Sequence, residues 1–239
     1  MCLVVLAWQV LERRPLVLVG NRDELHARAS AAMHWWRVPR LLGGRFGVVT
    51  NLRGATAPPA PPSRGTLIPR FLGGGLSPSA FLAELAPEAH RYAGFSLLVG
   101  DGRELGYLSN GDGARPRLLE PGVHGLSNAP LAADWRKVRV SRERLAARLA
   151  VPLGEPEALL ELLADRTPAP DGELADGGLG LERERALSAP FVVDATYGTR
   201  AATALVLEAG GGGRVVERSH APDGSATGLR RFRLAAPTA

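Results

Sequence analysis

The alternation of apolar and polar positions divides this chain into β-strands at both ends and helices in between. Two apolar runs rich in β-branched residues, 2–10 and 16–20, are separated by the polar stretch 11–15, which predicts a β-hairpin. Turns at 101–102 and 210–213 are expected to join later strands as hairpins. The later strands are predicted at 46–52, 95–100, 104–109, 191–194, 203–208 and 214–217.

Helical patterns occupy the middle of the chain. Residues 66–72 and 79–85 predict two short helices, the first ended by three consecutive glycines. Asp134 is expected to be the N-cap of a helix that continues to about residue 149. Residues 155–164 predict another helix.

Strands that pair as hairpins, with helices between them, predict an α+β sandwich. In such a fold the first residue can lie at the end of a central strand, with its amine facing a cleft. At 239 residues and 45% hydrophobic, the chain can bury one large core or two small ones. The stretch 167–180 is expected to be a loop.

The composition narrows the class of protein. A single cysteine excludes an internal disulfide framework and a cysteine-rich zinc site, and it fits a reducing compartment. No apolar run approaches the roughly 18 residues of a membrane span. The charged residues Glu12, Arg13 and Arg14 interrupt the opening apolar run too early for a signal peptide. The chain is therefore expected to be cytoplasmic.

The net charge of +5 does not by itself indicate a nucleic-acid partner. Of the 29 basic residues only Lys137 is a lysine, and the arginines are spread along the chain. The densest basic stretch, 136–148, lies on a predicted helix without interleaved aromatic residues, so it is interpreted as a solvated face. No P-loop is present, and a Schiff-base lysine would have to be Lys137.

The one cysteine, Cys2, directly follows the initiator Met1. A small second residue normally allows an aminopeptidase to remove the methionine, which leaves a chain that begins with cysteine. That residue would carry a thiol and also an α-amine with a pKa of about 7.7–8.0, low enough for the amine to act as a base near neutrality. The alternative is that Cys2 is a small apolar residue in the first strand. Its position alone leaves both open.

A cluster of four polar residues, Asn21 to Glu24, follows the second strand. The hairpin folds this strand end back toward the start of the first strand, so Arg22 and Asp23 are expected to lie near Cys2. A cation beside a thiol lowers the pKa of the thiol, and a carboxylate can hold an α-amine in place. The alternative interpretation of these four residues is a solvated turn. The expected closeness of Arg22 and Asp23 to Cys2 favours a functional role instead. The five histidines show no metal-ligand spacing.

These residues resemble the motifs of a known family. Met1-Cys2 followed by Asn21-Arg22-Asp23-Glu24 is similar to the NRDE family, whose animal members are called transport and Golgi organisation proteins. Three further segments agree with the family pattern in the same order: Ser63-Arg64-Gly65, Gly125 to Ala129 with Trp135-Arg136-Lys137, and Tyr197 to Arg200. The resemblance spans nearly the whole chain and implies a single domain over residues 1–239.

The NRDE family is in turn similar to N-terminal-nucleophile hydrolases that cleave linear amides, such as penicillin V acylases and bile salt hydrolases. That resemblance implies an αββα sandwich of antiparallel sheets flanked by helices, with no metal or cofactor. The site residues that it implies are Cys2 as the nucleophile, Arg22 and Asp23 after the first hairpin, Asn128 in the oxyanion hole, Arg200 near the nucleophile, and Asn51 as a polar substrate contact.

Two departures from the family pattern change the expectation. The family carries a Gly-Gly-Thr-Trp-Leu-Gly segment before the strand that ends in Thr-Asn, whereas here Gly43-Gly44-Arg45 runs directly into Phe46. Loss of a strand there would leave an unpaired sheet edge or force a new pairing, and it puts the activity in question. Ser96 stands where the family has an asparagine, which keeps a polar group but shortens its reach.

Two functions follow from these resemblances. As an enzyme, the chain would transfer the acyl group of a small-molecule amide to Cys2 and then hydrolyse the thioester. As a carrier, it would bind haem or acyl-CoA without cleaving it, because animal members of the family are implicated in haem trafficking and lipid metabolism. In that alternative Cys2 or His124 would ligate the haem iron. Trp35-Trp36 would then form an apolar wall, although ordinary core packing is favoured for these tryptophans.

Overall fold

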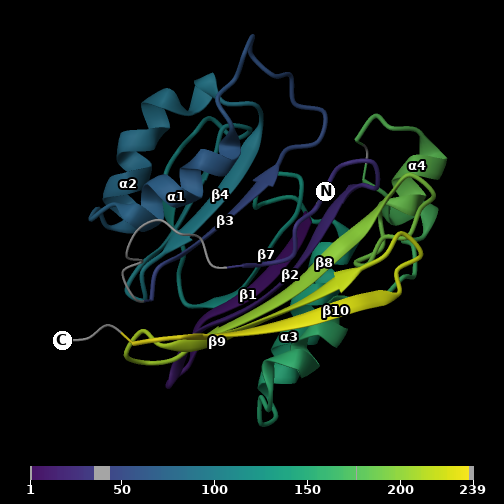
Figure 1. Ribbon diagram of the computed structural model, residues 1–239. Helices are drawn as coiled ribbons and strands as arrows, with labels where there is room; N and C mark the ends of the chain where they lie inside the picture. The colour runs from purple at the N-terminus through teal and green to yellow at the C-terminus, as the bar shows by residue number, and fades with distance from the viewer. Residues whose placement is uncertain (1, 35–43, 176, 237–239) are drawn as a thin grey trace.

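The computed structural model describes residues 2–34, 44–175 and 177–236. These residues form two antiparallel β-sheets that pack face to face, and helices cover the outer face of each sheet (Figure 1). The predicted α+β class is therefore confirmed.

The larger sheet has six strands in the order β10-β9-β8-β2-β1-β7. Their bounds are β1 (Cys2–Leu11), β2 (Arg14–Leu25), β7 (Gly122–Leu126), β8 (Tyr197–Leu207), β9 (Gly213–His220) and β10 (Ala226–Leu234). β1 and β2 form the predicted N-terminal hairpin, in which Leu6 lies opposite Leu18. The strand expected at 191–194 is wrong, because this segment forms a single isolated bridge, between Val193 and Gly198.

The smaller sheet has four strands in the order β3-β4-β5-β6. Their bounds are β3 (Phe46–Asn51), β4 (Phe95–Gly100), β5 (Leu105–Ser109) and β6 (Arg117–Leu118). The first three confirm predicted strands. β4 and β5 join through a turn in which the Asp101 carboxylate accepts hydrogen bonds from the backbone N–H groups of Arg103 and Glu104, both at 3.0 Å. Within the described residues β3 is an edge strand, which is one of the two outcomes expected for the shortened segment before it.

Short helices flank both sheets. Their bounds are α1 (Leu67–Gly73), α2 (Pro78–Leu85), α3 (Arg136–Leu149) and α4 (Leu181–Ala186), with 3₁₀ helices η1 (Arg64–Thr66), η2 (Ala86–Arg91), η3 (Pro156–Leu163) and η4 (Asp171–Glu173). The helix expected at 155–164 is thus a 3₁₀ helix, and the expected loop at 167–180 contains η4. None of the helices in the described residues has the length and hydrophobicity that a bilayer span requires.

The start of α3 differs from the prediction. Trp135 occupies the N-cap position without a side-chain capping bond, so Asp134 is not the cap. The Asp134 carboxylate instead forms an exposed ion pair with Arg139, at 3.1 Å. α3 packs closely on β7, because a Cβ atom on Gly125 would lie 2.6 Å from Cγ1 of Val138. The glycine therefore allows the helix to approach the sheet.

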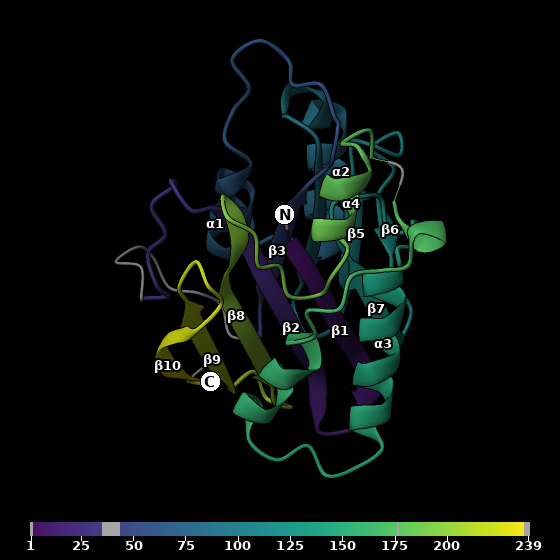
Figure 2. The same ribbon diagram turned by 90° about the vertical axis from the view of Figure 1, so that its right-hand side faces the viewer.

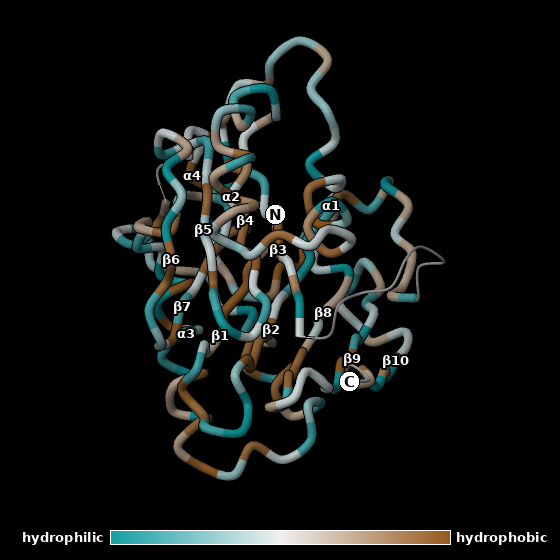
Figure 3. Tube along the Cα trace, turned by 90° about the vertical axis from the view of Figure 1, so that its left-hand side faces the viewer, coloured by the Kyte–Doolittle hydropathy of each residue, from teal (hydrophilic) through white to brown (hydrophobic). Residues whose placement is uncertain are grey.

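Among the described residues, the three largest hydrophobic cores fill the spaces between the layers, and apolar strand segments run through the interior in Figure 3. The middle core lies between the two sheets and joins Trp8 of β1 to Phe46 of β3. An outer core packs Val5 of β1 against Val138 of α3 and against η3. The third core packs Leu97 of β4 against α1 and α2. Because successive side chains point to opposite faces, β1 contributes to two cores at once.

Candidate functional site

The N-terminal end of β1 lies inside the larger sheet, between β2 and β7, and at the same end of the sheet as α4 (Figure 2). Cys2 is paired with Arg22 on β2, and Arg22 is paired in turn with Ala201 on β8. Cys2 is partly exposed, so this strand end reaches the surface. The hairpin thus places Arg22 directly across from the one cysteine.

A β-bulge makes Arg200 of β8 an extra residue between the positions that pair with Arg22 and Asp23. Bulges of this kind redirect side chains and are over-represented next to active sites. Within the described residues, the Arg200 guanidinium donates a hydrogen bond to the His26 carbonyl at 3.4 Å. Arg200 therefore lies two strands away from Cys2 and contacts a neighbouring loop.

Asp23 is a buried carboxylate, 3% exposed, beside the thiol. Its Oδ1 accepts a hydrogen bond from the Thr199 hydroxyl at 2.7 Å. Burial raises the pKa of Asp23, while the charge of Lys137 and the Thr199 hydrogen bond act in the opposite direction. The carboxylate thus depends on nearby positive charge to remain ionised.

The pKa of the Cys2 thiol is raised above its ordinary value, first by burial and then by the negative charge of Asp23. Arg22 lowers this pKa, but by less. The expectation that Arg22 brings the thiol below its ordinary pKa is therefore wrong. The reason is that burial and the Asp23 charge outweigh Arg22, whose side chain is exposed and donates to Ser30 Oγ, so that solvent screens its charge.

One residue of the site was placed wrongly by the sequence-based interpretation. Lys137 lies in the first turn of α3, where a solvated basic face was expected, yet it is only 2% exposed. Its Nζ donates to the Leu187 carbonyl at 2.9 Å. Burial lowers the pKa of Lys137 to about 8, against the opposing effect of Asp23. The signal in the sequence was its identity, because each of the other basic residues among the 29 is an arginine.

The two outer residues of the four-residue polar cluster turn away from the thiol. Asn21 is buried, and its side-chain amide donates to the carbonyls of Leu163 and Pro190, both at 2.9 Å. Glu24 forms a surface ion pair with Arg28 at 2.9 Å. Asn21 therefore anchors the segments that cover the sheet. Of the inner two residues, Asp23 is buried beside the thiol and Arg22 is exposed.

Asn128 connects the start of β1 with the end of β3. Its Oδ1 accepts a hydrogen bond from the backbone N–H of Cys2 at 3.1 Å. Its Nδ2 donates to the backbone carbonyl and to Oδ1 of Asn51, at 2.9 and 2.7 Å. Ser127 Oγ donates to the Cys2 carbonyl at 2.9 Å, and the Thr50 hydroxyl donates to the Ser127 carbonyl at 2.8 Å. These bonds bring three of the sequence-predicted site residues together at the junction of the two sheets.

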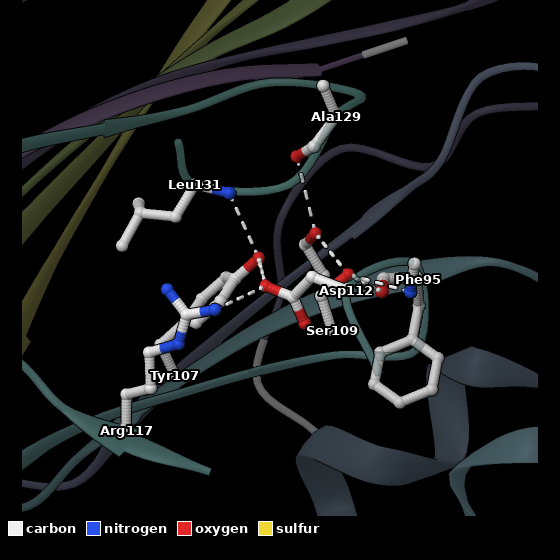
Figure 4. Close-up of polar contacts among 9 residues, drawn as sticks. Phe95, Tyr107, Ser109, Asp112, Arg117, Ala129 and Leu131 are labelled. Carbon is white, nitrogen blue, oxygen red and sulfur yellow. Dashed lines mark hydrogen bonds and ion pairs between the residues drawn. The ribbon is translucent and has the colours of Figure 1, made fainter. Parts of the chain in front are cut away.

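The segment that follows β7 is held by polar side chains of the smaller sheet (Figure 4). The Tyr107 hydroxyl accepts a hydrogen bond from the Leu131 N–H at 2.9 Å and donates to the Asp112 carboxylate at 3.4 Å. Ser96 Oγ donates to the Ala129 carbonyl at 3.3 Å. That distance is longer than the 2.5–3.0 Å typical of O–H···O hydrogen bonds, so this contact is weak.

A buried ion pair closes the site on the side of α4. Arg53, just beyond β3, donates to Glu184 of α4, and both side chains are only 7% exposed. The Arg53 backbone N–H donates to the Asn128 carbonyl at 2.8 Å, and its guanidinium lies 4.5 Å from the centre of the Trp135 ring. These side chains and Lys137 line a cavity of about 10 Å³, room for about one water molecule.

The two alternative residues suggested for haem ligation, Cys2 and His124, lie on neighbouring strands of the larger sheet. His124 of β7 lies opposite Leu6, which is four residues along β1 from Cys2. At about 3.3 Å of rise per residue, the backbones of His124 and Cys2 are roughly 13 Å apart. Trp35 and Trp36 lie outside the described residues. In the part of the chain that the structure covers, no three His, Cys, Asp or Glu side chains are grouped as metal ligands would be.

Fold and site together define a class: an α+β protein with two stacked antiparallel sheets, whose cysteine lies at the start of an inner strand beside buried Asp, Asn and Lys side chains. The family model described as Transport and Golgi organisation 2 matches residues 1–45 and 42–222, and the chain belongs to this family. The match confirms the family-level resemblance inferred from the polar motif after the first hairpin.

Curated relatives carry the same name. The mouse Transport and Golgi organization 2 homolog is 27% identical over 237 residues, covering 85% of this chain and 86% of the mouse protein. The bovine homolog is 28% identical and the human homolog 27% identical, each over 237 residues with the same shares covered. The similarity therefore extends over most of both chains.

Proposed function

We propose that this chain is a cysteine amide hydrolase of the N-terminal-nucleophile type, with Cys2 as the nucleophile once Met1 has been removed. The observation that carries the proposal is the hydrogen bond from the backbone nitrogen of Cys2 to Oδ1 of Asn128, at 3.1 Å. That nitrogen would be the α-amine of the mature chain, held beside its own thiol. The order of the layers, helices outside two antiparallel sheets, supports an N-terminal-nucleophile-like αββα sandwich.

In this mechanism the α-amine of Cys2 removes the thiol proton, and the thiolate attacks the acyl carbon of a linear amide. The carbonyl electron pair moves to the oxygen and forms a tetrahedral oxyanion. When the carbonyl re-forms, the carbon–nitrogen bond breaks and the ammonium returns its proton to the leaving amine. Water, deprotonated by the same α-amine, then attacks the thioester and releases the carboxylic acid and the free thiol.

The geometry supports a division of roles between the two asparagines. Nδ2 of Asn128 donates to two oxygens of Asn51, so Asn128 acts by orienting Asn51 and the Cys2 nitrogen. Nδ2 of Asn51 has no hydrogen-bond partner within the described residues, and it is the better candidate for the oxyanion donor. A donor of this kind contributes about 2.7–4 kcal/mol to transition-state stabilisation.

The remaining candidate residues surround the nucleophile with charge. Asp23, next to Cys2, would hold the α-amine in place. Arg22 is exposed opposite Cys2, so it is available to contact a polar group of the substrate. Arg200 lies farther out on the β8 bulge and is proposed as a second contact at the rim.

A carrier of haem or acyl-CoA is the second candidate function. The observation that favours it is the raised pKa of the Cys2 thiol, because a protonated thiol is a poor nucleophile. The family name refers to transport, which is compatible with binding without cleavage.

Substitution of Asn128 distinguishes the two functions. Under the hydrolase mechanism Asn128→Ala should lower kcat by about 10²–10³-fold, because the oxyanion donor and the α-amine lose their orientation. The dissociation constant for the same N-acyl amide, measured by titration calorimetry, should change little. Turnover would be measured on a panel of N-acyl amino acids and other linear amides.

Asn21→Ala is the matched control, since Asn21 is also a buried asparagine, 2% exposed against 1% for Asn128, but it anchors other segments. It should lower stability and leave kcat near that of the wild type. Equal loss of turnover in both variants would show that Asn128 acts only through folding. A wild type that binds haem or acyl-CoA tightly and cleaves no amide would support the carrier.

A further inference from the structure

The short helix α4 buries a charged side chain instead of an apolar face. Of its six residues, Leu181–Ala186, only Glu184 is buried, and Leu181 at the start of the helix is 53% exposed. A surface helix ordinarily packs on the fold through a stripe of apolar side chains. Burial of a carboxylate costs free energy unless the carboxylate is paired and hydrogen-bonded. The attachment of α4 therefore depends mainly on the groups that Glu184 binds.

The carboxylate of Glu184 accepts hydrogen bonds on both of its oxygens. Oε2 accepts from the Arg53 guanidinium, and Oε1 accepts from the backbone N–H of Gly177 at 3.0 Å. The Trp135 ring lies under the guanidinium, 4.5 Å from ring centre to Cζ, and helps to hold the cation in place. A Cβ atom on Gly177 would lie 2.4 Å from Cδ of Arg53, so a glycine is needed for this approach. An arginine and a backbone N–H directed at one carboxylate form a carboxylate-binding pocket.

This pocket adjoins the candidate catalytic residues. Arg53 follows Asn51 by two positions, and its backbone N–H donates to the Asn128 carbonyl at 2.8 Å. The side chain of Asn128 accepts the hydrogen bond from the Cys2 nitrogen at 3.1 Å. Hydrogen bonds through Asn128 therefore connect the pocket with the nucleophile.

The charges beside the pocket favour an anion from solution. The adjoining cavity is lined by three basic side chains, Arg53, Arg136 and Lys137, and by two acidic ones, Glu173 and Glu184. If Glu184 withdraws, three basic side chains face one acidic side chain. The Glu173 side chain is 42% exposed and that of Arg136 is 25% exposed, so this side of the cavity lies close to solvent.

We propose that Arg53 and the Gly177 N–H form a subsite for a carboxylate of the substrate, and that Glu184 occupies this subsite until the substrate displaces it. The substrates are then amides that also carry a carboxylate, of which N-acyl amino acids are the simplest. Binding exchanges one ion pair for another, since the ligand takes both donors and Glu184 moves into water with α4. The inference deepens the proposed function and rests on it for cleavage, whereas the binding step stands without it.

The first test compares two ligands that differ only in charge, N-hexanoylglycine and N-hexanoylglycinamide. Titration calorimetry at neutral pH would use Cys2→Ser as the background, so that neither ligand is consumed. Glu184→Gln should raise the affinity for N-hexanoylglycine by about tenfold, because the internal competitor loses its charge, and leave the affinity for the amide unchanged. Arg53→Met should abolish the preference for the carboxylate. Equal affinity for the two ligands in Glu184→Gln, or a preference that survives Arg53→Met, would overturn the proposal.

The second test is chemical rescue of Glu184→Ala, in which the carboxylate that fills the pocket is removed. Sodium acetate should raise the Tm of this variant in a saturable way, because acetate binds the folded state at Arg53. Acetamide, or sodium chloride at the same ionic strength, should not. Asp171→Ala is the matched control, since it breaks an exposed ion pair, and acetate should affect it no more than chloride does. Absence of rescue, or equal rescue of Asp171→Ala, would contradict the subsite.

The subsite and the proposed function can fail separately. If Glu184→Ala does not fold, Glu184→Gln keeps the size of the side chain and the first test still decides. If the carboxylate-selective binding is found while the wild type cleaves no amide, the subsite stands and the hydrolase proposal falls. If the wild type cleaves N-hexanoylglycinamide as efficiently as N-hexanoylglycine, the hydrolase stands and the subsite falls.

Discussion

Cys2→Ser is expected to lower kcat for amide hydrolysis by about 10³-fold or more, since loss of the nucleophile in a hydrolase can cost up to about 10⁶. A serine hydroxyl ionises far less readily than a thiol, so the α-amine could not generate the nucleophile efficiently. Serine is also small, which allows removal of Met1 and keeps the α-amine in place. Steady-state turnover of an N-acyl amide, measured at saturating substrate, tests this expectation.

The same variant separates catalysis from binding. Binding of the N-acyl amide by Cys2→Ser should remain close to that of the wild type, because the thiol acts in the reaction rather than in recognition. Turnover that survives the substitution would place the nucleophile at another residue. Tight haem or acyl-CoA binding that survives it, with no hydrolysis by the wild type, would establish the carrier.

Glu184→Ala is expected to lower the free energy of unfolding by about 3–5 kcal/mol, because it leaves Arg53 as an uncompensated buried charge. Both side chains of this pair are 7% exposed, so solvent cannot replace the lost partner. The pair also ties α4 to the end of β3, beside Asn51 and Asn128. Urea denaturation of the wild type and the variant would give the difference.

The neighbouring residue of α4 supplies a matched control. Arg185 pairs with Asp171 on the surface, where the two side chains are 44% and 55% exposed. Asp171→Ala removes one partner of that ion pair within the same short helix environment, and it should leave stability nearly unchanged because water solvates the remaining charge. An equal effect of Glu184→Ala and Asp171→Ala would show that the buried pair does not stabilise this end of the fold.

Local patterns in the sequence predict the elements whose pairing is also local. The β1–β2 and β4–β5 hairpins each join strands through a short turn, and their apolar runs identify them. β7 escapes prediction because it is short and contains two glycines, Gly122 and Gly125, and its strand conformation comes from pairing with β1. β10 escapes because arginines interrupt its apolar pattern, and β9 supplies its register.

In the candidate site, too, only the local contacts can be predicted from the sequence. The hairpin brings Arg22 and Asp23 to the end of β2 next to Cys2, and this follows from the sequence pattern alone. The burial of side chains on α3 does not follow from the sequence pattern. It depends on which face of α3 packs on the sheet, and that face is set by contacts such as that of Val138 with Gly125. The sequence pattern therefore predicts a solvated lysine on this helix, where the structure has a buried one, and it predicts the wrong direction for the pKa of the thiol.

Intact-mass spectrometry of protein expressed without an N-terminal tag decides whether Cys2 becomes an N-terminal nucleophile. We expect a mass that lacks Met1, and a single acyl adduct that maps to Cys2 after brief treatment with a cysteine-directed acylating probe. A protein that quantitatively retains methionine would contradict it, because Cys2 would then have no free α-amine to act as the base.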